Sequence, residues 1–235
     1  MTKDKKKFVG LLAAVAFALA GTASADTIYN FTTGVNGNAN QSANATFDFS
    51  SATAFTLKLT NIGNIIDIAS VLDDFSFNIG GTFSNLSLNT ITGGGFVDCT
   101  ASDNTTSSCS NNGVLNANGK WSSTVSANNV SLVAGVGEHP YGIVNNSIFA
   151  NGNLDGLRNG EHNPYILGPV TFSFSVTETS IPTISNVVFS FGTKPDFING
   201  VPGTSPDTPL PEPESLALLA IGLLSLGLAR RKNRS

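Results

Sequence analysis

The chain has 235 residues, with 12 basic and 16 acidic side chains and a net charge of −4. Four basic residues precede residue 8 and four follow residue 229, so residues 26–210 hold four basic and 13 acidic side chains, a net charge of −9. Binding to nucleic acid or to an anionic lipid surface requires clustered lysine and arginine. The charge distribution therefore excludes nuclease and DNA-uptake functions for this region.

The first 25 residues have the pattern of a secretory signal peptide. Four lysines precede an apolar stretch over residues 8–20, and Ala23-Ser24-Ala25 is a small-x-small cleavage site. We expect signal peptidase to cleave after Ala25, so that Asp26 becomes the mature N-terminus. The positive-inside rule then places the residues that follow outside the cytoplasm.

Apolar residues alternate with Ser, Thr or Asn through much of residues 26–192, which predicts β-strands. Phe-x-Phe occurs four times, and a period of two places both rings on one face of a strand. These pairs are Phe47/Phe49, Phe75/Phe77, Phe172/Phe174 and Phe189/Phe191. With the turn residues between them, the patterns predict strands over 54–60, 70–79, 82–92, 130–134, 169–177 and 184–191.

The strand pattern predicts an all-β fold, a single antiparallel β-sandwich of the jelly-roll kind with Phe rings between its sheets. About 185 residues between the two ends suit one domain, expected over residues 26–192. Residues 29–46 are expected to form either an edge strand or a loop. Residues 193–210 are rich in proline, which cannot join the interior of a sheet, and are predicted to be an extended linker.

Cys99 and Cys109 are the only cysteines of the chain. Because export places them in an oxidising compartment, we expect a disulfide, which would stabilise the fold by about 2.5 to 3 kcal/mol in the chain-entropy model. The alternative is a redox or metal-binding pair, but the spacing is not Cys-x-x-Cys and no histidine is nearby in the sequence.

Motifs of common enzymes are absent from the sequence. It contains no Gly-x-Ser-x-Gly elbow, no His-Glu-x-x-His and no phosphate-binding loop, so we expect no enzymatic activity. Asp73 and Asp74 are adjacent carboxylates, which point to opposite faces of a strand and cannot flank one glycosidic bond without a bulge. We interpret this pair as the solvated start of the strand that contains Phe75.

Both histidines of the protein lie in look-alike segments, residues 137–141 with the sequence Gly-Glu-His-Pro-Tyr and residues 160–165 with the sequence Gly-Glu-His-Asn-Pro-Tyr. If the segments meet, two His and two Glu side chains could bind zinc or another divalent ion. Alternatively, both are loops whose tyrosine rings pack on the sheet.

Residues 151–162 resemble a calcium-binding loop. Oxygen-bearing side chains occupy loop positions 1, 3 and 5, but position 12 is His162 and the carboxylate falls one place early. With two charged ligands we expect weak binding, at about 10⁻⁴ to 10⁻³ M. A plain loop is the alternative, and no other cofactor is expected. The candidate ligands are Asn151, Asn153, Asp155 and Glu161.

The last residues combine a short motif, an apolar run over residues 216–229 and a basic cluster, in that order. The apolar run, at about 1.5 Å per residue, reaches some 22 Å as a helix, against a hydrocarbon core of about 30 Å. It therefore suits a temporary membrane handle better than a permanent span. The motif and the start of the cluster are Pro211, Glu212 and Pro213, and Arg230, Arg231 and Lys232.

This tail resembles the PEP-CTERM sorting signal, which an exosortase-type membrane protease recognises in Gram-negative bacteria. The resemblance implies that residues 211–235 are a sorting signal with a transmembrane helix, inserted transiently in the inner membrane. Residues 160–172 and 184–193 are similar to segments of uncharacterised PEP-CTERM proteins, which implies no activity. The mature protein is then expected at the outer surface or in the extracellular matrix.

The resulting expectation is a noncatalytic exported surface or matrix protein, associated with exopolysaccharide in a biofilm. The alternative is a carbohydrate-binding or adhesive β-sandwich module. Few aromatic side chains could serve it as stacking platforms for sugars, and Trp121 could equally be a core residue. The tyrosines are Tyr29, Tyr141 and Tyr165.

Overall fold

The computed structural model describes most of residues 27–203 and leaves residues 1–26 and 204–235 outside the description. The described ranges are 27–33, 40–81, 84–99, 109–113, 116–135, 137, 139–149, 157, 161–177, 181–192 and 196–203. The expected signal peptide and sorting signal therefore lie outside the described residues. Within the described ranges, no helix is long and apolar enough to cross a membrane.

Strands dominate the described residues, which confirms the all-β prediction. Residues 26–205 form one compact unit. The strands are β1 Thr27–Thr33, β2 Ala43–Ser51, β3 Ala54–Asn61, β4 Leu72–Ile79, β5 Ser84–Thr92, β6 Phe96–Asp98, β7 Ser110–Asn111, β8 Trp121–Ser126, β9 Asn129–Ala134, β10 Ile143–Val144, β11 Tyr165–Leu167, β12 Val170–Thr177, β13 Ile184–Phe191 and β14 Asp196–Pro202. Two short 3-10 helices are η1 Ile68–Ser70 and η2 Asn146–Phe149.

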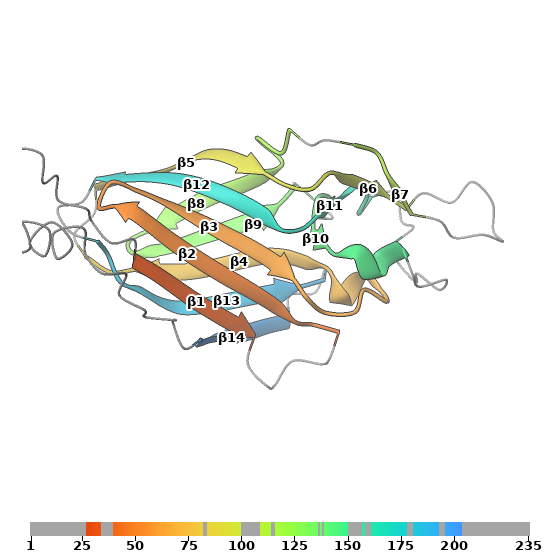
Figure 1. The fold of residues 1–235 in the computed structure, drawn as a ribbon, viewed down its shortest axis with the longest axis horizontal. Coiled ribbons are helices and arrows are strands. Elements are labelled where there is room, and N and C mark those ends of the chain that lie inside the picture. The colour runs from red at the N-terminus through yellow and green to blue at the C-terminus, as the bar shows by residue number, and fades with distance from the viewer. Residues whose placement is uncertain are drawn as a thin grey trace, which may run out of the picture. The chain divides into compact units, whose positions relative to one another are not determined.

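The strands form one large curled sheet (Figure 1). One half has the order β5-β12-β3-β2-β1, and the chain of neighbours continues through β14 and β13 to β4. On one side of β4, β9 pairs with most of its length and β8 pairs with β9 in turn. The strands β10, β11, β6 and β7 continue from the first residue of β4. All pairs are antiparallel except β10 with β11. The structure thus shows a single curled sheet, and the predicted β-sandwich is a more specific description of the same strands.

Phenylalanine rings hold the two halves of the curl together. Three strands separate β2 from β4 in the sheet, yet the rings of Phe47 and Phe77 lie 4.8 Å apart between centroids. Phe77 also contacts Phe55 of β3 and Phe174 of β12, each at 6.4 Å. All eight rings of the Phe-x-Phe pairs are at most 2 % exposed, as the period-two pattern predicts. The core therefore lies inside the curl.

Each of the six predicted strand ranges corresponds to a strand of the structure. The strand predicted over 70–79 begins at Leu72 because η1 takes up the residues before it, where Ser70 Oγ donates to Asp67 O at 2.6 Å. β1 is an inner strand between β2 and β14, so neither a loop nor an edge strand describes residues 27–33. β8 was not among the predicted strands.

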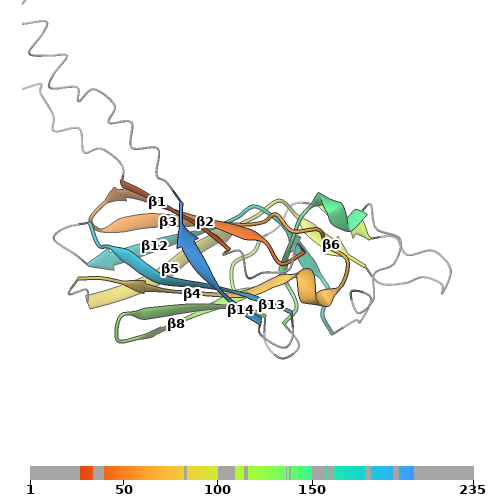
Figure 2. The same ribbon diagram turned by 90° about the horizontal axis from the view of Figure 1, so that it is seen from below.

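The linker prediction for residues 193–210 is wrong for β14, which pairs with β13 on one side and β1 on the other (Figure 2). The only proline in β14 is Pro202, its last residue. Ile198 faces the core at 8 % exposed, and a Cβ on Gly200 would lie only 2.8 Å from a methyl of Val187. The prediction rested on the proline content of residues 193–210 as a whole and therefore missed the short strand β14 within them. The domain thus extends beyond residue 192.

The predicted disulfide between Cys99 and Cys109 is confirmed. It joins the ends of the short antiparallel pair β6 and β7, where Val97 lies opposite Asn111. Cys99 is buried, and its backbone N–H donates to Asn163 Oδ1 at 2.8 Å. The disulfide thus ties β6 to β7, and the hydrogen bond to Asn163 anchors this pair of strands to the segment that leads into β11.

We predict that Ile198→Asp lowers the free energy of unfolding by about 3 kcal/mol or more, because it buries an unpaired carboxylate in the strand between β1 and β13. Asn199→Asp is the matched control, since Asn199 is exposed on the same strand. We expect it to change stability by less than about 0.5 kcal/mol. Urea unfolding of both variants measures the difference; equal effects would contradict the placement of β14 in the sheet.

Candidate functional site

The two look-alike histidine segments meet in the structure. Ile143 of β10 pairs in parallel with Ile166 of β11, so the spacing of 23 residues between the two Gly-Glu-His triplets is kept in the register. The backbone N–H of Tyr141 donates to Pro164 O at 2.6 Å, and that of Ile166 donates to Gly142 O at 2.9 Å. The sequence repeat thus corresponds to a physical pairing of backbones.

The histidines themselves have different surroundings. His139 Nδ1 lies 3.7 Å from Asp74 Oδ1, whereas His162 is buried at 7 % exposed. Among the described residues, no three or more His, Cys, Asp or Glu side chains are grouped so as to hold a metal ion. Glu138 lies outside the described residues. The zinc interpretation therefore has no support in the described part of the chain.

The candidate calcium ligands Asn151, Asn153 and Asp155 lie outside the described residues, so calcium binding stays a prediction. Glu161 is described and exposed. The tyrosines follow the packing alternative: Tyr165 is fully buried, and the half-buried Tyr141 ring packs against Phe96 with 5.8 Å between centroids. Packing accounts for both tyrosines of the repeated segments.

The segment of residues 139–142, which we call the His139 segment, has an unusual backbone. His139 and Tyr141 have φ angles of 57° and 75°, in the left-handed region that such side chains disfavour. Such residues cost on the order of 1 to 3 kcal/mol each and persist only where the surroundings hold them. The contacts of the segment must therefore offset this strain.

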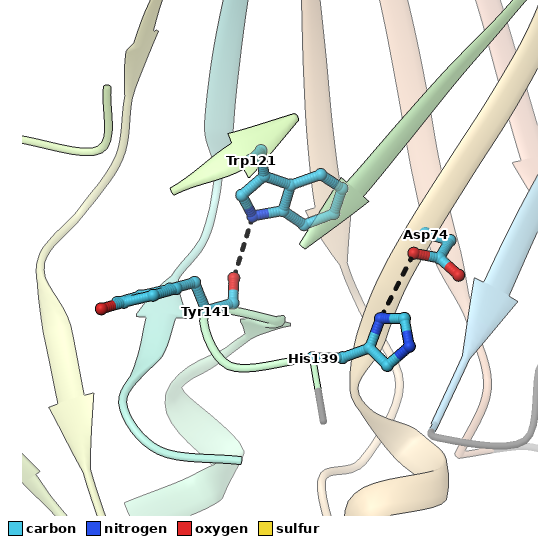
Figure 3. A network of polar contacts seen from close by, with 4 residues as sticks. All are labelled: Asp74, Trp121, His139 and Tyr141. Atoms are coloured by element: carbon cyan, nitrogen blue, oxygen red, sulfur yellow. Dashed lines mark hydrogen bonds and ion pairs between the residues drawn. The ribbon is translucent and has the colours of Figure 1, made fainter. Parts of the chain in front are cut away.

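Neighbouring residues of the His139 segment reach two different strands (Figure 3). Tyr141 O accepts a hydrogen bond of 2.9 Å from Trp121 Nε1 of β8, and Tyr141 OH accepts one of 3.2 Å from Lys120 Nζ. On the other side, His139 lies against Asp74 of β4. The segment thus bridges β8 and β4 at one end of the sheet.

Asp74 is half-buried on the outer side of β4, opposite Ser190 of β13 and Val133 of β9. Neither Asp74 Oδ1 nor His139 Nδ1 has a hydrogen-bond partner, and their separation makes an ion pair when the imidazole is protonated. Burial raises the pKa of the Asp74 carboxyl, whereas the charge of His139 lowers it. Because both side chains are largely buried, salt and solvent screen the attraction between them only in part.

Asp73 is fully buried, so its interpretation as part of a solvated strand start is wrong. A bulge in the pairing with β13 places Ser190 opposite Asp74 and Phe191 opposite Leu72, leaving Asp73 as the additional residue. The Asp73 side chain then lies against Gly142, where a Cβ would overlap Oδ1. The two carboxylates do lie on opposite faces of β4, as the sequence predicts. The burial of Asp73 depends in addition on Gly142, which covers its side chain.

The carboxyl group of Asp73 has no hydrogen-bond partner on either oxygen. The nearby N–H of Gly192 donates to Val71 O at 3.0 Å instead. Burial raises the pKa of Asp73 well above its usual range, and the charge of Asp74 raises it further, whereas the Gly192 N–H lowers it. Asp73 is therefore neutral over a wider pH range than an ordinary aspartate.

A shallow cleft of about 520 Å³ lies between the loop after β3 and the loop after β10. Two of the asparagines that line it serve the structure: Asn61 Nδ2 donates to Ser70 O and Ile143 O, and Asn145 Nδ2 donates to Asn61 O and Gly63 O. These amide groups tie the two loops together and are not available to a ligand. The cleft is therefore a weaker candidate site than the His139 segment.

Trp121 is a core residue and not a sugar platform. It is 3 % exposed, and its ring packs against Phe172 with 5.3 Å between centroids. Among the described residues, the large apolar side chain with the greatest exposure is Phe197 of β14, at 70 %. The sequence did not identify Phe197 as a candidate, because the residues of β14 were predicted to be a linker.

No protein family model, curated protein or solved structure matches this chain.

We predict that Asp73→Asn stabilises the protein more at high than at low pH. A raised folded-state pKa means that the folded state binds the proton more tightly, so wild-type stability falls as pH rises from about 3.9, the unfolded value, through the folded-state pKa. Asn carries no charge and removes this fall. Urea unfolding near pH 4 and near pH 8 should show a difference between variant and wild type that grows with pH.

Asp196→Asn is the control for this measurement, because Asp196 is exposed and its Oδ2 accepts a hydrogen bond from Gln41. It should not reproduce the Asp73→Asn effect. A stability difference for Asp73→Asn that is constant across pH would show that the Asp73 carboxyl titrates normally.

Proposed function

We propose that this protein is a noncatalytic, exported surface or extracellular-matrix protein, sorted when an exosortase-type membrane protease recognises its tail. The observation that carries the proposal is the order of three elements at the end of the sequence: Pro211-Glu212-Pro213, the apolar run over 216–229 and the basic cluster beginning at Arg230. A signal-peptide pattern over residues 1–25 supports the same route. Signal peptidase and transient insertion in the inner membrane belong to this proposal.

The disulfide supports export. Disulfides form and persist in oxidising compartments and are rare in the cytosol. The Cys99–Cys109 bond is present in the structure, and no free cysteine occurs among the described residues. An exported body of this kind would keep the bond after leaving the cytoplasm.

The first and last strands of the described domain are neighbours in the sheet. β1 and β14 are antiparallel neighbours, with Phe31 opposite Pro202. The N–H of Gly203 then donates to Asn30 O at 2.8 Å, which continues the pairing toward the start of β1. The last described residue, Gly203, therefore lies beside Asn30 of β1.

For the fold, we infer a β-sandwich of the jelly-roll kind as the finer description. Contacts such as Phe47 with Phe77 pack one half of the curled sheet face to face against the other. The direct contact between β5 and β8, the outer strands of the two halves, is consistent with two opposed layers.

The outer face of β1, β2, β3, β12 and β5 suits a hydrated polysaccharide matrix. Its side chains are mainly Ser, Thr and Asn, and they hydrogen-bond across strands: Thr46 Oγ1 donates to Asn30 Oδ1 at 2.9 Å, and Ser87 and Ser175 hydroxyls lie 2.8 Å apart. A neutral surface of donors and acceptors can exchange hydrogen bonds with water and sugar hydroxyls alike. We therefore associate the mature protein with exopolysaccharide.

The alternative function is a carbohydrate-binding or adhesive module. Phe197 favours it, because a ring that is 70 % exposed on a sheet surface can stack against the apolar face of a sugar ring. Ser190 lies directly opposite it on β13.

For the proposed function, we expect mass spectrometry of the mature protein to find Asp26 at the N-terminus and a C-terminus near residues 211–213. Deletion of residues 230–235 should cause mislocalisation, because the apolar run loses its cytoplasmic anchor. An intact Ser235 on most mature molecules would remove the sorting assignment.

For the alternative function, we expect binding on a glycan array that Phe197→Ala weakens by at least about tenfold, corresponding to roughly 1.4 kcal/mol of stacking. Phe149→Ala is a control, because Phe149 is also exposed but lies on η2. The absence of glycan binding by the wild type, or equal loss in both variants, would exclude the module.

A further inference from the structure

We infer that the His139 segment is a pH-sensitive latch on β4, closed while Asp73 is neutral and His139 is charged and loosened when both lose their protons. This inference concerns the folded body and is independent of how the tail is processed.

Two adjacent residues of β4 hold the same four-residue segment from two sides. Asp74 points outward and pairs with His139, while Asp73 is buried beneath Gly142, which has no Cβ to overlap the carboxyl oxygen. One end of the segment therefore depends on an ion pair and the other on a buried acid. Both contacts involve a group that titrates.

The two contacts weaken in the same direction as pH rises. The contact between His139 and Asp74 is an ion pair only while the imidazole is protonated, and a neutral imidazole loses the attraction to the carboxylate. Ionised Asp73 would be a buried charge without a hydrogen-bond partner, which is strongly unfavourable next to Gly142 and Val71. Relaxation of the segment would let water reach the Asp73 carboxylate.

Backbone strain makes the segment ready to move. The left-handed φ angles of His139 and Tyr141 store unfavourable energy that contacts with β4 help to offset. Contacts with other strands do not titrate in this range: Tyr141 N–H bonds to Pro164 O, and Trp121 Nε1–H bonds to Tyr141 O. Loosening would therefore begin on the β4 side of the segment.

Other ionisable groups around the segment leave these two contacts as the titrating ones. Burial raises the pKa of Tyr165 on β11 far above its usual value, with a further rise from the charge of Asp73, so Tyr165 stays neutral. Lys120, which precedes β8, donates to Tyr141 OH. On β4 the groups are Asp73 and Asp74 themselves, and Glu138 lies outside the described residues.

The protein contains a built-in reporter of the latch. Trp121 is its single tryptophan, and the indole N–H donates to Tyr141 O, within the His139 segment. Displacement of the segment changes the polarity and hydrogen bonding around this indole. Tryptophan fluorescence therefore follows the segment without a label.

The test uses the mature protein with the Cys99–Cys109 disulfide intact. The pH is raised stepwise from mildly acidic values. We expect a shift in Trp121 fluorescence while far-UV circular dichroism stays constant. Over the same range, amide exchange in residues 139–144, corrected for its intrinsic pH dependence, should become faster as the segment opens locally. Exchange in β2 and β12 should not change.

Variants divide the effect between the two contacts. His139→Gln removes the ion-pair part, Asp73→Asn removes the buried-acid part, and the double variant should show no fluorescence transition. His162→Gln, in the paired segment, is the matched control and should keep the wild-type transition. Asp74→Asn tests the ion pair from its other partner, should His139→Gln fail to fold. A wild type without a transition, or a double variant that keeps it, would overturn the latch.

Discussion

The contact between Phe47 and Phe77 is the interaction on which the rest of the structure depends. The two rings come from strands that are not neighbours in the sheet, so they meet only because the sheet curls on itself. Burial of aromatic rings is the largest favourable contribution available to a body with so few charges, and truncating such a ring typically costs about 3 to 5 kcal/mol. The rings define the inside, and the Ser, Thr and Asn side chains that alternate with them define the outside.

The strand β14 completes this curl. It lies between β13 and β1, and without it the two halves of the sheet would have no backbone connection on that side. Ile198 contributes to the core and Phe197 to the surface, in the same alternation that the other strands show. The last strand of the body thus pairs with the first, and the two described ends of the domain come together for that reason.

The strand β4 combines two roles that usually conflict. Its residues Phe75 and Phe77 belong to the core, while Asp73 and Asp74 precede them on the same strand. A fully buried carboxyl without a partner is unfavourable for stability, and natural proteins keep such groups mainly where function or specificity requires them. In this fold, the bulge beside Asp73 and the strained His139 segment above it form one connected feature, which is why the site and the latch coincide.

The sequence by itself determined six of the strands, the sides on which the Phe rings lie, the disulfide pair and the sorting-signal patterns at both ends, because alternation and motif order are local properties of the chain. Three features were decided only by the tertiary structure. The prolines of residues 193–210 predicted a linker where β14 lies, because the partner strand β1 is far away in the sequence. The pairing of β10 with β11 brought the histidine segments together, yet placed His139 against Asp74 and not against His162. Asp73 became buried because Gly142 covers it, and such long-range contacts leave no periodic signal in the residues that make them.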